Sequence, residues 1–394
     1  MFPILLSSKA AVAPVFEEST SVGDLWTWGD GEFNGGSQLM HDNTTDLSSP
    51  VQVGVLYDWE TFHGSQNCVF MLKSNGTLWS AGDGAIGGLG TGSETDTQSP
   101  NQIGALTTWR KITGGQQSGK AVKSDGTLWA WGYSANGQKG TNNATNTNSP
   151  TQVGGLTTWG QLVNSFTNTA GCMTTSNVLY TWGKNNQGDS GLGNTTGHCS
   201  PVAVAGGGVW AHVASGQGHM IAVRTDGTLW GWGYNVVGNF GDGTTTQTSS
   251  PGQIGSLTDW EFCVTGQHSS HMLKTNGTLW SCGWNNKGQQ GDGTTTQRNS
   301  PVQIGTDTDW AFISAGTTSV YAVKDNGALY AWGENNLGQL GLGDTTNRSS
   351  PVQVGVLTTW RGGGNVSTTS LYAEGHRIGG GTAGKIAGHI KTNV

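Results

Sequence analysis

The segment from Lys123 to Gly140, KSDGTLWAWGYSANGQKG, holds the pattern that decides the fold of this 394-residue chain. An Asp-Gly pair marks a tight turn between two extended segments, and the second segment carries Trp129 and Trp131. Residues two apart on a strand point to the same face, so both indoles are expected to face one neighbour. Gly132 then admits close backbone approach, and a polar loop follows over residues 134–150.

The same unit recurs about every 50 residues, and three separate markers each count seven copies. The second aromatic of the motif stands at Trp28, Trp131, Trp182, Trp232 and Trp332, with Ala81 and Cys282 in the other two copies. Another Trp closes each unit, at Trp59, Trp109, Trp159, Trp210, Trp260, Trp310 and Trp360. A Pro precedes each closing Trp, at Pro50, Pro100, Pro150, Pro201, Pro251, Pro301 and Pro351.

Each unit reads as about four short strands separated by Gly, Asn-Gly and Asp-Gly turns, which is typical of a propeller blade. A single blade cannot cover its Trp side chains, whereas blades stacked in a circle cover them. With Trp or Tyr at the first aromatic position, these structural positions account for all but one of the 18 Trp residues. The exception is Trp284.

The two ends of the repeat predict how the circle closes. The first unit starts at GDLWTWG with no preceding strand, whereas TTSLYAE, Thr368–Glu374, has no following partner. We therefore expect the C-terminal strand to pair with Leu25–Gly29 in one shared blade, which removes two exposed sheet edges. The prediction is an all-β, seven-bladed β-propeller over residues 21–378, with an N-terminal docking arm over 1–20 and a Gly-rich tail over 379–394.

The repeated pattern DGTLWAWGxNxxGQxGxGTTTxxxSPxQ resembles the repeats of the regulator of chromosome condensation family, of the bacterial and phage type. The resemblance implies a seven-bladed propeller with a blade shared by both ends. It implies little about activity, because the family includes a nuclear nucleotide exchange factor, a plant photoreceptor and a bacterial β-lactamase inhibitor. The exchange factor's basic N-terminal tail and the photoreceptor's Gly-Trp-Arg-His-Thr motif have no counterpart here.

The family often has a His in a GxxHxxAV segment, and only His219 keeps it in this chain. We expect His219 to form hydrogen bonds inside its blade. Its equivalents in the other units are Cys68, Ser118, Thr169, Ser269, Ser319 and Ser370.

Composition excludes several classes of function. The net charge of −7, with 11% charged residues and no basic block, gives no electrostatic footprint for nucleic acid. No apolar run is long enough for a membrane span, and the N-terminus lacks the basic start of a clear signal peptide. Five Cys without a CxxC pair indicate no disulfide framework. We expect a virion or extracellular location and not a nuclear one.

No residue pattern indicates catalysis, a metal or a cofactor, so the chain is not expected to be an enzyme. His268 and His271 are three apart and should face opposite sides of a strand, which argues against a shared metal ion. The loops that begin at Asp242 and Asp292 lack the alternating ligands of a calcium loop.

The long polar loops are the better functional candidates, since long loops without structure of their own are usually functional or disordered. They suit a sugar or protein surface, although plain solvated loops remain an equal alternative. The arm 1–20 is too apolar for a free tail and is expected to pack on the disc or dock into a partner. Its apolar candidates are Phe2, Ile4, Leu5, Leu6 and Phe16.

The leading hypothesis is a non-enzymatic protein-interaction or adhesion module, specifically a structural or receptor-binding part of a phage tail or fibre. Its partners would be other proteins in an assembly, or a glycan or protein on a host surface. One alternative is a secreted or surface protein that binds and inhibits another protein. A second alternative is a guanine nucleotide exchange factor for a small GTPase.

Overall fold

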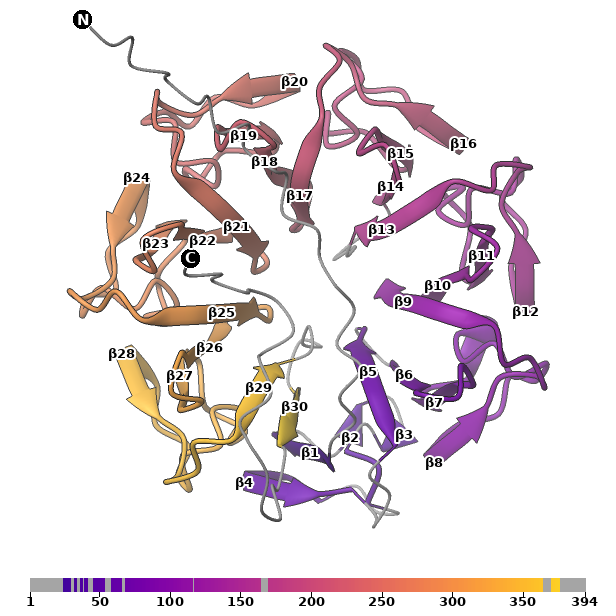
Figure 1. Cartoon of the computed structure of the whole chain (residues 1–394), viewed down its shortest axis with the longest axis horizontal. Coiled ribbons are helices and arrows are strands. Elements are labelled where there is room, and N and C mark those ends of the chain that lie inside the picture. The colour runs from indigo at the N-terminus through magenta and orange to yellow at the C-terminus, as the bar shows by residue number, and fades with distance from the viewer. Residues whose placement is uncertain are drawn as a thin grey trace, which may run out of the picture.

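The computed structural model shows an all-β propeller, with four-stranded antiparallel sheets placed around a ring (Figure 1). It describes residues 24–29, 32–33, 36–37, 39–41, 45–53, 58–65, 68–115, 117–163, 169–363 and 370–375. These residues form seven four-stranded sheets and one two-stranded sheet. We call the four-stranded sheets blades 1 to 7 in chain order. Blades 2 to 7 each use four consecutive strands, and blade 1 joins both ends of the chain.

The blades follow one another along the chain with the same strand order. Blade 1 contains β29 (Trp360–Gly363), β30 (Ser370–Gly375), β1 (Asp24–Gly29) and β4 (Leu47–Gln52). Blade 2 contains β5 (Trp59–Gly64), β6 (Cys68–Lys73), β7 (Leu78–Gly82) and β8 (Thr97–Gln102). Blade 3 contains β9 (Trp109–Gly115), β10 (Ser118–Lys123), β11 (Leu128–Gly132) and β12 (Thr147–Gln152). Blade 4 contains β13 (Trp159–Val163), β14 (Thr169–Thr174), β15 (Leu179–Gly183) and β16 (His198–Ala203).

The remaining blades complete the ring. Blade 5 contains β17 (Trp210–Ser215), β18 (His219–Arg224), β19 (Leu229–Gly233) and β20 (Thr248–Gln253). Blade 6 contains β21 (Trp260–Thr265), β22 (Ser269–Lys274), β23 (Leu279–Gly283) and β24 (Arg298–Gln303). Blade 7 contains β25 (Trp310–Ala315), β26 (Ser319–Lys324), β27 (Leu329–Gly333) and β28 (Arg348–Gln353). The short strands β2 (Glu32–Phe33) and β3 (Gly36–Ser37) pair with each other, and the 3-10 helix η1 spans Ala85–Gly87.

The predicted closure of the ring is confirmed. Strand β1 pairs with β30 in an antiparallel register that places Leu25 opposite Glu374 and Gly29 opposite Ser370. Strand β1 also pairs with β4, so the N-terminal strand lies inside its sheet and not at an edge. The ends of the chain are therefore joined by backbone hydrogen bonds in one blade, which leaves neither β1 nor β30 as an exposed edge.

The outermost strand of each blade lies at the perimeter of the ring (Figure 1) and carries the repeated Pro. In blade 3 this is Pro150 in β12, and β12 pairs only with β11. Pro has no N–H to donate, so it fits an edge strand and blocks the pairing of that edge with another chain. The recurring Ser-Pro dipeptides thus protect the blade edges of the propeller.

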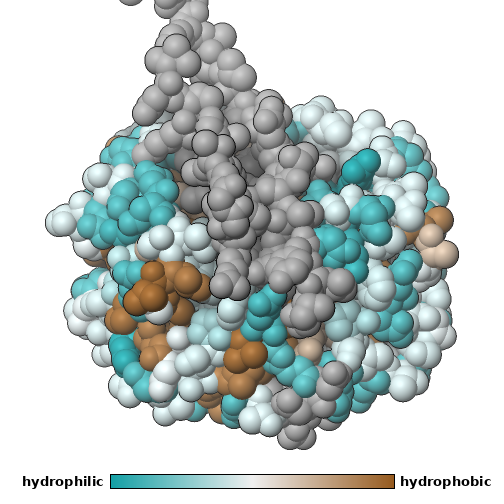
Figure 2. Space-filling model, turned by 60° about the horizontal axis from the view of Figure 1, so that its bottom comes forward, coloured by the Kyte–Doolittle hydropathy of each residue, from teal (hydrophilic) through white to brown (hydrophobic). Residues whose placement is uncertain are grey.

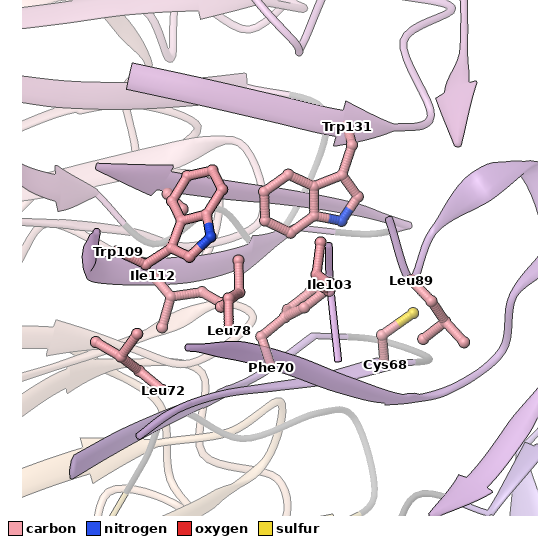
Figure 3. Packing of buried hydrophobic residues seen from close by; sticks show 10 residues of the cluster. Cys68, Phe70, Leu72, Leu78, Leu89, Ile103, Trp109, Ile112 and Trp131 are labelled. Carbon is pink, nitrogen blue, oxygen red and sulfur yellow. The ribbon is translucent and has the colours of Figure 1, made fainter. Parts of the chain in front are cut away.

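The core lies between blades and not within one sheet. Between blades 2 and 3, Trp131 reaches across to Phe70 with ring centroids 5.5 Å apart, above Leu78 and Ile103 (Figure 3). The twelve Trp at the second and closing positions are each at most 4% exposed, as the sequence predicts. Each buried indole removes a large apolar surface from water, so the interfaces between blades stabilise the ring.

Trp131 and its four counterparts also fasten their blades to the preceding blade. The Trp131 Nε1–H donates to the Gly88 carbonyl of blade 2 at 3.1 Å. In the next interface the Trp182 Nε1–H donates to the Gln138 carbonyl at 2.9 Å. The same bond recurs for Trp232, Trp332 and Trp28. For these five Trp, the loop of the preceding blade supplies the partner of the buried indole N–H.

Trp129, two residues before Trp131, has a different structural role at the outer end of the blade. Its ring packs edge-on against Trp109, with centroids 6.2 Å apart, and its Nε1–H donates to the Thr127 hydroxyl. Thr127 is held in turn by Asp125, whose carboxylate accepts from both its N–H and its hydroxyl. The Asp-Gly-Thr sequence of the turn therefore positions the first Trp of the motif.

Candidate interaction surface

The turns that follow the first strand of each blade gather around the middle of the ring. Figure 1 shows the arrowheads of β9, β13, β17, β21 and β25 pointing to the centre. Neighbouring turns bond to each other, because the Gln217 N–H donates to the Gln267 carbonyl and the Gln267 N–H donates to the Thr317 carbonyl. We call these turns, with the loops that begin after each third strand, the central face.

In blades 3, 5, 6 and 7, the residue after the third strand is fixed against these turns. The N–H of Tyr234 donates to the Gly218 carbonyl at 2.7 Å, and the N–H of Trp284 donates to the His268 carbonyl at 2.9 Å. The bond recurs for Tyr133 in blade 3 and Glu334 in blade 7, so the backbone repeats in these four blades. The side chains at this position of blades 2 to 7 differ. They are Asp83, Tyr133, Lys184, Tyr234, Trp284 and Glu334.

Blades 5 and 6 bring three rings and two amides together on the central face. His268 lies between Tyr234 and Trp284, with ring centroids 5.4 Å and 5.8 Å away. Beside them the Gln267 side-chain amide donates to the Gln217 amide oxygen at 2.5 Å. All five side chains are partly exposed. We call Gln217, Tyr234, Gln267, His268 and Trp284 the aromatic–amide patch.

The patch carries no net charge at neutral pH. Burial lowers the pKa of His268, and its Nδ1 is buried without a hydrogen-bond partner. On the adjoining loop, Lys287 Nζ lies 2.8 Å from the Glu334 carboxylate, which also accepts from the Thr318 hydroxyl. Partial burial raises the pKa of Glu334, but these two hydrogen bonds outweigh it, and the pKa is lowered overall. The cation and the anion therefore neutralise each other beside the patch.

His219 is placed inside its blade, as expected from its position in the repeat. It is fully buried, with Nε2 3.2 Å from the Ser270 hydroxyl and Nδ1 3.4 Å from the Asn239 side-chain amide. Burial, together with the nearby His268, lowers its pKa to about 3. This neutral, enclosed His is part of the interface between blades 5 and 6.

His268 and His271 lie in different surroundings, one in a turn and the other inside a strand. His268 lies in the turn before β22, on the central face, whereas His271 is buried within β22 beside the Ser269 hydroxyl. The prediction that both stand on one strand is wrong in this respect, because β22 begins at Ser269. Within the described ranges no group of three His, Cys, Asp or Glu side chains could hold a metal ion.

The polar loops have internal structure, which corrects the expectation of long loops without it. In blade 6 the Asn285 side chain donates to the carbonyls of Thr294 and Thr296 and accepts from the Gln290 N–H. Asp292, suggested by a calcium-like sequence, accepts from the Thr294 N–H and pairs with Arg298. The corresponding Asp242 likewise accepts from the N–H and hydroxyl of Thr244. In blades 5 and 6 a buried Asn and an Asp thus hold the loop closed and leave only its outward side chains for contact.

The predicted docking arm, including Phe2, Ile4, Leu5, Leu6 and Phe16, and the Gly-rich tail lie outside the described residues. Seen obliquely, the described surface is mostly hydrophilic or intermediate, with a few separate apolar patches (Figure 2). Among the residues that the structure describes, no helix has the length and apolar character needed to cross a lipid bilayer.

Known sequences and structures agree with this architecture. Residues 176–223, 276–323 and 326–361 match the Regulator of chromosome condensation (RCC1) repeat, and residues 210–239 match a second profile of the same description. No curated protein matches the chain in sequence. The chain therefore contains RCC1 repeats, and its predicted resemblance to that family is confirmed. The bacterial or phage type stays a prediction.

Solved RCC1-type propellers share the fold at low sequence identity. The structure of Prp20p from Saccharomyces cerevisiae is 18% identical, with a TM-score of 0.80 over 91% of this chain and 93% of that one. Human WBSCR16 is 16% identical, with a TM-score of 0.80 over 90% and 99% of the two chains. Yeast RCC1 (Prp20) bound to Kap60 is 17% identical, with a TM-score of 0.79 over 96% and 97%. At this identity the similarity shows the fold alone.

The sequence left one clue to the patch unused. Trp284 is the one Trp outside the repeated positions, and the structure places it in the patch. Gln217, Tyr234 and Gln267 could not be found in this way, because nothing in their local sequence shows that blades 5 and 6 bring them together.

Proposed function

We propose that the chain is a non-enzymatic interaction module that binds its partner through the central face. One observation carries this proposal: the backbone of this face repeats from blade to blade, whereas the side chains after each third strand do not. Rigid scaffolds commonly present binding residues in this way, since variation there does not disturb the frame. The structural Trp, by contrast, recur at nearly every equivalent position.

Two further points support a binding role over catalysis. His219 and His271 are fully buried, and the low pKa of each keeps it neutral, so neither is placed to exchange protons with a substrate. Prp20p is described as binding Gsp1p and histones, and a second structure shows it bound to Kap60. A propeller of this type can therefore serve as a protein-binding surface.

Site-specific photo-crosslinking tests the proposal. A photoreactive amino acid at Asn286, exposed on the central face, should crosslink one discrete partner in the native source. The matched control is the same amino acid at Leu106, which is 47% exposed and precedes β9 at the end far from the central face. Equal crosslinking from both positions, or from Leu106 alone, would contradict the proposal.

The finer hypothesis, a structural or receptor-binding component of a phage tail or fibre, rests on the apolar arm 1–20 and the neutral polar composition. Deletion of residues 1–20 should then prevent incorporation into purified particles while the propeller still folds. Normal incorporation of the deletion variant, or a chain that is always an inert monomer, would count against a particle component with a docking arm.

The alternatives have direct assays of their own. An exchange factor would accelerate nucleotide release from a small GTPase, and a secreted inhibitor would suppress a target enzyme at stoichiometric ratio. At the central face the charges of Lys287 and Glu334 neutralise each other, so we place the exchange factor last.

A further inference from the structure

We propose that the aromatic–amide patch is a binding site for a short, neutral oligosaccharide. This inference rests on the proposed function and names the chemistry of a ligand for one part of the central face. It starts from Trp284, whose ring is partly exposed and whose position in the repeat does not require an aromatic residue. At the same backbone position the other blades hold Asp83, Tyr133, Lys184, Tyr234 and Glu334.

The three rings of the patch form a continuous aromatic surface across two blades. His268 is tilted by 42° to Tyr234 and by 62° to Trp284, so the rings form a bent row and not a stacked core. The row lies at the surface because each ring belongs to a partly exposed residue. A pyranose ring has one face of C–H groups, which packs well on aromatic side chains that present an apolar surface next to water.

The amides beside the rings match the hydroxyl groups of a sugar. A hydroxyl is both a donor and an acceptor, and a carboxamide offers both kinds of atom. The bond from Gln267 to Gln217 uses one donor and one acceptor of the pair and fixes both side chains. Gln187 adds a third amide, since a Cβ at Gly218 would collide with the Gln187 side-chain oxygen. Glycine at 218 thus lets this amide lie against the turn.

The charge of the site selects against anionic ligands. His268 is neutral at pH 7 because its pKa is lowered, and Lys287 is already paired with Glu334. A phosphate or a sialic acid would find no free cation in the patch, whereas a neutral sugar requires none.

The test measures binding of neutral oligosaccharides to the full chain by calorimetry. The panel holds short β-1,4-linked glucose, N-acetylglucosamine and xylose chains and α-1,4-linked glucose chains, with sialylated and sulfated chains for comparison. We expect saturable binding of at least one neutral oligosaccharide and of no anionic one. Trp284→Ala should weaken that binding by at least about tenfold, because an aromatic stacking contact is lost.

Leu106→Ala is the control, since Leu106 is 47% exposed and precedes β9 at the end far from the central face. It should leave oligosaccharide affinity unchanged. Trp284→Tyr, which keeps an aromatic face, should retain most of the affinity, and this separates lost stacking from a disturbed blade.

Three results would overturn the proposal: no binding across the neutral panel, binding that prefers the anionic chains, or equal loss in Trp284→Ala and Leu106→Ala. Crosslinking from Asn286 to a discrete protein, with no oligosaccharide bound, would reject the carbohydrate site and keep the interaction function. Failure of both experiments would reject both proposals.

Discussion

At the scale of single residues, position in the blade decides the role of each Trp. Trp131 is fully buried, packs on Phe70 of the preceding blade and donates to that blade's loop. Trp129, two residues earlier, stays partly exposed and packs on Trp109 of its own blade. Both indoles point to the same side of the strand, as the spacing predicts, but only the second reaches the neighbouring blade. Trp284 has neither role, and that freedom is what makes it a candidate for binding.

The second Trp of the motif packs closely against the loop of the preceding blade, which predicts that this loop requires a glycine. At Gly140, which has φ +76°, an added Cβ would lie 2.7 Å from Nε1 of Trp182. Gly154, with φ +57°, has open space where its Cβ would be. In both Ala variants the left-handed backbone conformation costs about 1–2 kcal/mol of unfolding free energy. Gly140→Ala should lose about 1–3 kcal/mol more from overpacking, measured by urea unfolding. Equal losses in the two variants would show that the indole contact does not limit the packing.

At the scale of strands and turns, a cation closes the outer end of most blades. Lys123 Nζ lies 3.6 Å from the ring centroid of Trp129 and 4.9 Å from that of Trp109, so it sits against both rings. The same arrangement recurs with Lys73, Arg224, Lys274 and Lys324. Blade 4 has Thr174 at this position instead. In these five blades the Lys or Arg that ends the second strand thus links the first and third strands through their aromatic rings.

Replacing Lys123 with Met tests this link. Met keeps an apolar stem against the indoles but removes the charge, so the variant should lose about 0.5–2 kcal/mol of unfolding free energy. Lys184→Met is the control, because Lys184 is exposed on the central face. Chemical denaturation monitored by Trp fluorescence measures both variants. The interpretation fails if Lys123→Met is as stable as the control.

The strands and turns could be predicted from the sequence more completely than the central face could. Trp spacing, the Asp-Gly turn and the Ser-Pro edge all act within one repeat, so each copy shows the same physical requirement. The polar loops were harder, because Asn285 closes its loop by bonds to residues 9 and 11 positions later. The patch was harder still, since Gln217 and Gln267 meet only when blade 5 lies against blade 6. Local patterns do not encode contacts of that range.

At the scale of the whole molecule, buried His residues make the ring sensitive to acid. Burial lowers the pKa of His63 to about 4 and that of His212 and His271 to about 3. In the unfolded chain these side chains take up protons near pH 6.5. The unfolded state therefore binds more protons than the folded state once the pH falls below that value, and stability declines with it.

We expect the melting temperature to be steady above pH 6.5 and to fall from pH 6.5 to 5, a window above the ordinary range of the carboxylates. Each fully buried His contributes about 1.4 kcal/mol per pH unit across this window. His219→Ser places there the residue found at Ser269 in the next blade. This variant should show a shallower decline even if it melts earlier throughout. A melting temperature that stays level from pH 7 to 5 would contradict the account.

The closure of the ring in blade 1 sets the stability of the whole disc, because a break there exposes two sheet edges and unpairs the ends of the chain. Since Leu25 lies opposite Glu374, Leu25→Cys with Glu374→Cys should form a disulfide across β1 and β30. The variant is best made with Cys199→Ser, because the other four Cys are buried. Closing so long a loop should stabilise the fold by up to about 6 kcal/mol on chain-entropy arguments, seen as a higher melting temperature that is lost on reduction. Pairing Leu25→Cys with Ala373→Cys is the register control, since adjacent residues point to opposite faces and should not crosslink. If the control pair crosslinks as readily as the first, the two strands do not hold this register, and the blade shared by both ends is wrong.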